Sequence, residues 1–117
     1  MTALDLHTLL SGYQLSSPDE STLQLAIAHC LDLHRVTYER EVRLNADDRP
    51  DFMVGDVAIE VKVGGSASAV LRQLHRYAQH DCVKEILLVS TLVNHIGLTE
   101  SFNGKPVIAF FVGRSFL

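Results

Sequence analysis

The sequence predicts a single α/β domain with a mixed sheet flanked by helices. Apolar residues recur every three or four positions before residue 35 and again within residues 67–80, as on one face of a helix. Alternating and hairpin-like segments fill residues 36–63, and the continuous apolar run Ile86–Val89 is typical of a strand covered on both faces. A chain of 117 residues suits one domain, so we assign residues 1–117 to a single unit.

The first long helix is predicted to run from Ser17 to about His34. Ser17 is the expected N-cap, Pro18 suits the first helical position, and Glu20 would complete a capping box. A shorter helix is expected within Met1–Tyr13. The remaining predicted elements are strands at Val36–Leu44, Asp51–Val54 and Val57–Val63, a helix at Ala67–His80, a strand at Glu85–Ser90, a short helix at Leu92–Ile96 and a last strand at Pro106–Val112 after an Asn103-Gly104 turn. In the first strand we expect Val36, Tyr38, Val42 and Leu44 to share one face.

The two strands around Gly55-Asp56 form a predicted hairpin whose two-residue turn fixes the register. In that register Asp51 lies directly opposite Glu60, and Lys62 projects on the same face as Glu60. Two opposed carboxylates destabilise a sheet unless a cation compensates their charges. The other face of the hairpin is apolar and is expected to be buried; it comprises Phe52, Val54, Ile59 and Val61.

Two acids and an amine on one patch predict metal-assisted hydrolysis of a phosphate ester. Carboxylate oxygens with water in the remaining positions suit Mg²⁺ or Mn²⁺, and Lys62 would stabilise a hydroxide or the charge that develops on a phosphate. The competing interpretation is that Asp51, Glu60 and Lys62 are ordinary solvated charges at a sheet rim. Gly64-Gly65 directly after the strand favours the first interpretation, because it lets the backbone approach another molecule closely.

The segment RPDFMVGDVAIEVK, Arg49–Lys62, resembles the signature of the PD-(D/E)XK nuclease superfamily, which is Pro-Asp, a variable hairpin and Glu-x-Lys. The predicted element order is similar to the αβββαβ restriction endonuclease-like core of that superfamily, from Ser17 to Val112. Gln73-x-x-x-Tyr77 is similar to the glutamine–tyrosine pattern in the nuclease domains of recombination helicases. Tyr77 also continues the apolar helix stripe of Val70 and Leu74, so a core position is the stronger explanation for it.

This resemblance implies that Asp51, Glu60 and the backbone carbonyl of Val61 hold the metal, that water attacks a phosphodiester, and that Lys62 and Gln73 belong to the catalytic group. Members of the superfamily commonly add an acid from the first helix or strand. Glu20 and Glu41 are the two candidates, and for Glu20 the capping box is an equally good explanation. The residues expected to contact nucleic acid are Lys62, Gly64, Gly65, Ser66, Arg72 and Arg76, although a solvated helix face accounts equally well for the two arginines.

The resemblance favours a Mg²⁺-dependent deoxyribonuclease, an endonuclease rather than an exonuclease, similar to small stand-alone Holliday junction resolvases or phage-type enzymes. Such a short chain is expected to act as a homodimer. The alternative is a catalytically inactive nuclease-fold protein that binds nucleic acid or acts as an adaptor, with a partner protein supplying contacts to DNA. A formal charge of −4 and a pI near 5.8 give no overall positive field, which fits this alternative better.

Neither a membrane nor a zinc site is predicted. No window contains the ~18 consecutive apolar residues of a transmembrane helix, and the six histidines and two cysteines have no zinc-ligand spacing. We therefore expect a soluble protein of the reducing cytoplasm that is not exported.

Overall fold

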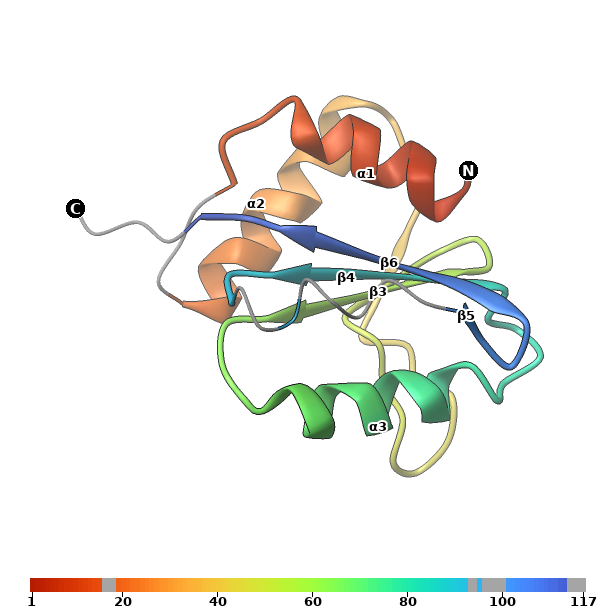
Figure 1. Cartoon of the computed structure of the whole chain (residues 1–117). Helices are drawn as coiled ribbons and strands as arrows, with labels where there is room; N and C mark the ends of the chain where they lie inside the picture. Colours follow the sequence, from red (N-terminus) through yellow and green to blue (C-terminus); the bar gives the residue numbers. More distant parts are fainter. Residues whose placement is uncertain (16–18, 93–94, 96–100, 114–117) are drawn as a thin grey trace.

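A computed structural model of the chain describes residues 1–15, 19–92, 95 and 101–113 (Figure 1). Within these residues the elements, in chain order, are α1 (Ala3–Ser11), α2 (Glu20–Leu33), β1 (Glu39–Arg40), β2 (Phe52–Val54), β3 (Val57–Lys62), α3 (Ala67–Tyr77), β4 (Glu85–Ser90), β5 (Ser101–Phe102) and β6 (Lys105–Phe111). The strands form a mixed sheet in the order β1-β2-β3-β4-β6-β5. The predicted α/β class is confirmed.

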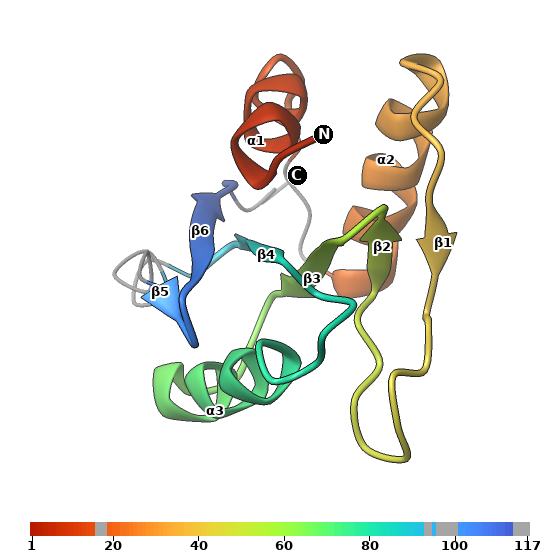
Figure 2. The same cartoon turned by 90° about the vertical axis from the view of Figure 1, so that its right-hand side faces the viewer.

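Helices cover both faces of the sheet: α1 and α2 lie on one side and α3 on the other (Figure 2). Alternate residues of β3 therefore enter two separate apolar clusters. Ile59 and Val61 pack in the α1/α2 cluster, whereas Ala58 packs in the α3 cluster with Leu74. The same alternation holds in β4, where all of Ile86–Val89 is buried. The continuous apolar run is thus a central strand, as predicted.

The hairpin has the predicted pairing, and the strand–helix–strand unit is parallel. In the antiparallel pair β2–β3, Val54 lies opposite Val57 and Phe52 opposite Ile59. Strands β3 and β4, which α3 connects, are parallel, and β4 pairs in parallel with β6. Gly55 at the hairpin turn has a φ of 58°, a conformation that glycine adopts without steric cost. The side chains of Phe52, Val54, Ile59 and Val61 are buried on the α1/α2 side, as expected.

The first strand is shorter than predicted. Only Glu39 and Arg40 pair with β2, because Glu41 adopts a left-handed φ of 52° that ends the extended stretch. The prediction that four apolar residues share one face is also wrong: Val36 and Tyr38 pack against the α1/α2 cluster, whereas Val42 and Leu44 pack against the α3 cluster. The chain changes sides of the sheet at Glu41.

The start of α2 also differs from the prediction. The N-cap is Asp19, whose side chain accepts a hydrogen bond from the Thr22 N–H at 2.8 Å, so Ser17 is not the cap. Pro18 lies outside the described residues. Because Asp19 caps the helix, Glu20 is the first helical residue and does not complete a capping box.

The other boundaries are close to those predicted. Helix α3 ends at Tyr77 instead of His80, β4 has the predicted bounds, and β6 starts and ends one residue early. Strand β5 was not predicted; it pairs with the start of β6 across the Asn103-Gly104 turn. The short helix expected at Leu92–Ile96 lies mostly outside the described residues. Within the described part of the chain, no helix is long and apolar enough to cross a membrane.

The α1/α2 cluster predicts a large difference between two leucines of α2. Leu31 is fully buried, whereas Leu25 is 62% exposed. Leu31→Ala should lower the free energy of unfolding by about 2–5 kcal/mol, because it removes buried methyl groups and leaves a cavity. Leu25→Ala, the matched control, should change it by less than about 0.5 kcal/mol. Urea unfolding measures both, and equal effects would contradict the packing of α2.

Candidate functional site

The structure brings Glu60 and Lys62 together on the α3 side of β3. Lys62 Nζ lies 3.1 Å from Glu60 Oε2, and Glu60 is only 3% exposed. The hydroxyl of Tyr77 on α3 donates a hydrogen bond to Glu60 Oε1 at 2.9 Å. Both carboxylate oxygens of Glu60 therefore have a partner, which a buried carboxylate requires.

Gln73 and Tyr77 form one hydrogen-bonded unit with Glu60. Gln73 Nε2 donates to the Tyr77 hydroxyl at 2.9 Å, as their spacing of one helical turn permits. Tyr77 is fully buried, so its ring belongs to the core while its hydroxyl belongs to the site. The core position considered for Tyr77 is confirmed, and its hydroxyl also contacts Glu60. Gln73 reaches Glu60 only through this tyrosine.

Asp51 immediately precedes β2, and the hairpin register places it opposite Glu60 on the α3 side. Its Oδ2 accepts a hydrogen bond from the Val61 N–H at 2.7 Å. The N–H and C=O of one strand residue point to the same side, so the Val61 carbonyl also faces this strand, at position 50. Pro50 has no N–H to donate to it. Thus the site contains a backbone oxygen beside the two carboxylates.

Burial and mutual repulsion disfavour two negative charges at this position. Burial raises the pKa of Asp51 to about 7, and the neighbouring charges of Glu60 and Glu20 act in the same direction. Burial also raises the pKa of Glu60, although Lys62 opposes this effect. The pKa of Tyr77 is raised well above its usual value by burial and by Glu60, so its hydroxyl remains a donor.

Of the two additional acids considered, Glu20 interacts electrostatically with Asp51. Its charge contributes to the raised pKa of Asp51, and the capping-box explanation no longer applies to it. Glu41 approaches Asp51 through the backbone: its N–H donates to the Asp51 carbonyl at 3.0 Å, while its side chain is exposed.

The residues expected to contact nucleic acid occupy different positions. Gly64, Gly65 and Ser66 form an exposed loop between β3 and α3, where the Ser66 hydroxyl caps α3 by accepting the Ala69 N–H at 3.2 Å. Arg72 is exposed on α3. The Arg76 guanidinium is bound to the carboxylate of Asp48, with Nε and Oδ1 2.9 Å apart. Arg76 thus has a structural partner inside the protein.

The available ligands are hard oxygens: the carboxylates of Asp51 and Glu60 and the carbonyl of Val61. This set fits Mg²⁺ or Mn²⁺, which bind proteins through one or two carboxylates and keep several waters. Among the residues that the structure describes, no three His, Cys, Asp or Glu side chains are grouped to hold a metal ion. A cation here would depend on two carboxylates, the carbonyl, water and substrate oxygens.

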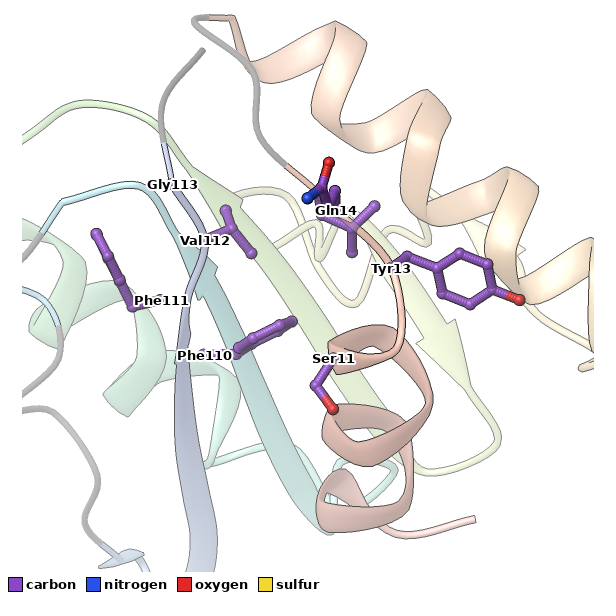
Figure 3. A pocket seen from close by; sticks show the side chains of 8 residues that line it. Ser11, Tyr13, Gln14, Phe110, Phe111, Val112 and Gly113 are labelled. Atoms are coloured by element: carbon purple, nitrogen blue, oxygen red, sulfur yellow. The ribbon is translucent and has the colours of Figure 1, made fainter.

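One hollow of the described surface lies away from this group of residues. It has a volume of about 400 Å³ and lies where the chain leaves α1 and where β6 ends. Figure 3 shows Tyr13, Gln14, Phe110 and Val112 around it. Its lining contains no charged side chain, so it does not fit a metal ion or a phosphate.

Sequence patterns did not identify Asp48 and His80, which the structure places together beside α3. Asp48 is buried in the connector between β1 and β2, and His80 Nε2 lies 2.8 Å from its Oδ2. The sequence feature that pointed to such a contact is the spacing of Arg76 and His80. Both side chains can bind a carboxylate, and they lie one helical turn apart near the end of a helix. That spacing alone does not identify the acid they bind.

Comparison of the chain with protein-family models, with curated proteins and with solved structures gives no match in any of the three. The resemblance to PD-(D/E)XK nucleases therefore rests on the motif residues and the order of the elements. The site's chemistry must be argued from its own groups.

The raised pKa of Asp51 predicts that this residue destabilises the metal-free protein at high pH. A carboxyl whose pKa is raised on folding lowers stability as pH rises from its unfolded pKa toward its folded pKa. In EDTA, Asp51→Asn should therefore be more stable than the wild type at about pH 8. The expected difference in free energy of unfolding is roughly 1–3 kcal/mol, since water that reaches the carboxyl limits the effect. The advantage should disappear near pH 4.

Urea unfolding across this pH range measures the effect. Asp56→Asn, which removes an exposed carboxylate from the same hairpin, is the matched control and should show no such dependence. Equal pH profiles for Asp51→Asn and the wild type would contradict the raised pKa of Asp51.

The Tyr77 hydroxyl predicts a second effect on stability. Tyr77→Phe keeps the buried ring but leaves Glu60 Oε1 and the Gln73 amide without their shared partner, which should cost about 1–3 kcal/mol. Tyr38→Phe removes a hydroxyl that donates to Asp32 at an exposed position and should cost less than about 1 kcal/mol. Thermal unfolding compares the two variants. A loss of stability in Tyr77→Phe as small as that in Tyr38→Phe would contradict the buried hydrogen bond between Tyr77 and Glu60.

Proposed function

We propose that the protein is a metal-dependent nuclease of the PD-(D/E)XK type that hydrolyses phosphodiester bonds in DNA. The observation that supports this most is the group formed by Asp51, Glu60, the Val61 carbonyl and Lys62 at one end of β3. Two carboxylates with raised pKa values and an ammonium lie together on the α3 side of the sheet, and the backbone of Val61 contacts one of these carboxylates. The carboxylates suit a divalent cation, and the ammonium beside them suits a phosphate, so the group fits both together.

The order of elements supports the same proposal. Helix α2 precedes β1, β2 and β3, and α3 then leads to the parallel strand β4. This is the αβββαβ order of the restriction endonuclease-like core. Of the motif residues, Asp51 immediately precedes the second of the three strands, and Glu60 and Lys62 lie in the third. We therefore propose this core as the fold within the α/β class.

Each residue of the group has a separate task in the proposed reaction. Asp51, Glu60 and the Val61 carbonyl would hold Mg²⁺ or Mn²⁺. When bound, the cation supplies positive charge to phosphate oxygens and lowers the pKa of a water molecule. Lys62 stabilises the negative charge that develops on the phosphate under attack. Tyr77 holds the Glu60 carboxylate in place by its hydrogen bond, and Gln73 orients the tyrosine hydroxyl.

The preference for DNA, for endonucleolytic cleavage and for branched substrates such as four-way junctions comes from the family resemblance. So does the proposed homodimer, which would present two sites to two strands. The alternative is a catalytically inactive protein of the same fold that binds nucleic acid or a partner protein. One observation favours it: the formal charge of −4, which gives DNA no overall attraction.

A cleavage assay tests the proposal. The purified protein is incubated with labelled single-stranded, linear duplex and four-way-junction DNA in Mg²⁺, Mn²⁺ or EDTA. Cleavage should require the cation. Lys62→Ala should reduce the cleavage rate about 100-fold or more, because the ammonium that stabilises the negative charge developing on the phosphate is lost. Asp51→Asn should abolish it. Lys84→Ala is the matched control, since Lys84 is exposed just before β4, at the opposite end of the β3–β4 pair from Lys62, and should cleave normally.

The alternative predicts a different result from the same experiment. A wild type that cleaves none of these substrates in either metal but binds one of them would overturn the nuclease proposal. Cleavage that persists in Lys62→Ala and Asp51→Asn would assign the activity to another site or to a contaminant.

A further inference from the structure

The connector between β1 and β2 leaves the sheet before it returns to form the site. In Figure 2 it descends from the end of β1 toward α3 and rises again into β2. Its last residue is Asp51. The position of the Asp51 carboxylate therefore depends on how this connector is held, because only one short strand follows it before the hairpin turn.

Asp48 fastens the connector to the end of α3. Its side chain is buried, and its two oxygens bind different residues: Arg76 Nε lies 2.9 Å from Oδ1, and His80 Nε2 lies 2.8 Å from Oδ2. Asn45 Nδ2 donates a third bond to Oδ2 at 3.2 Å. These partners outweigh burial, so the pKa of Asp48 is lowered and the carboxylate remains charged.

The connector is also closed on itself around Asp48. Asn45 Oδ1 accepts the backbone N–H groups of Asp47 and Asp48 at 2.8 and 2.7 Å, and the Leu44 N–H donates to the Asp48 carbonyl at 2.8 Å. A turn with this many internal bonds has few alternative conformations. The contact at Asp48 therefore fixes the whole turn.

Helix α3 contacts both halves of the site through adjacent residues. Tyr77 donates to Glu60, and Arg76 binds Asp48, three residues before Asp51. One rigid helix thus sets the positions of the two carboxylate-bearing segments relative to each other. We propose that Asp48 is a positioning residue that holds the Asp51 carboxylate opposite Glu60 by fastening the connector to α3. This inference rests on the proposed function for its chemical purpose.

Asp48 itself is not a second catalytic acid. Both oxygens are occupied by donors from within the protein, and only 3% of the residue is exposed, so neither metal nor substrate reaches it. Its effect on the site must pass through the backbone of residues 49–51.

The Val61 amide reports the position of Asp51 without any metal or activity, because it donates directly to Asp51 Oδ2. In Asp48→Asn, which keeps the shape but loses the charge, native-state hydrogen exchange at this amide should accelerate about tenfold. The amide of Leu88 in β4 should be unaffected. Arg76→Gln, at a half-exposed side chain, should have the same effect, and combining the two changes should add little.

Mn²⁺ affinity of the purified protein is the second measurement. It should fall about tenfold in Asp48→Asn, because metal affinity depends on the residues that orient the metal ligands. Leu6→Ala, a core change on the α1 side, is the control for a general loss of stability and should leave Mn²⁺ affinity unchanged.

Unchanged exchange at the Val61 amide in both Asp48→Asn and Arg76→Gln would overturn the positioning role. So would an equal acceleration of Val61 and Leu88 exchange in Arg76→Gln. A wild type that neither binds Mn²⁺ nor cleaves DNA would overturn the proposed function instead, while Val61 exchange still tests the role of Asp48 alone.

Discussion

The burial of Glu60 beneath α3 is the constraint on which the rest of the site depends. A carboxylate removed from water is costly unless its oxygens are bound by donors. Here one oxygen is bound by Tyr77 and the other by Lys62. Both partners are held in turn, Tyr77 by the packing of α3 and by Gln73, and Lys62 by its place two residues along the same strand. The Tyr77–Glu60 hydrogen bond thus adds a polar contact to the apolar packing of α3 on the sheet.

The two faces of the sheet differ in the side chains that they carry. The α1/α2 face is an apolar cluster, in which β2 and β3 contribute only hydrophobic side chains. The α3 face combines an apolar cluster with charged groups at one end of β3. The charged groups therefore lie on one face only, whereas both faces contribute apolar packing. Strands β3 and β4 contribute apolar residues to both clusters, which explains why these strands are almost entirely buried.

Local patterns were sufficient to predict the elements whose conformation is decided locally. The Gly55-Asp56 turn specified the hairpin register and hence the opposition of Asp51 and Glu60, and the apolar run Ile86–Val89 specified the central strand. Predictions failed where a contact distant in sequence or a single backbone angle decides. Alternation after Val36 did not reveal the left-handed conformation of Glu41, which turns the chain to the other side of the sheet.

Burial of polar residues was the least predictable property. Asp48 stands in a run of polar residues that a solvent-exposed loop would also have, and its partners Arg76 and His80 follow 28 and 32 residues later. Nothing local distinguishes it from its neighbour Asp47, which is exposed. Similarly, the place of Tyr77 in a helical stripe predicted its burial but not the acceptor of its hydroxyl.

Pro50 shows that an absent group can define a site. It has no backbone N–H, so this position cannot donate a hydrogen bond to β3, and the paired part of β2 begins only at Phe52. The Val61 N–H binds the side chain of Asp51 instead of a backbone carbonyl. The Pro-Asp pair therefore replaces one step of the backbone ladder with a side-chain hydrogen bond, so a residue without charge limits strand pairing beside Asp51.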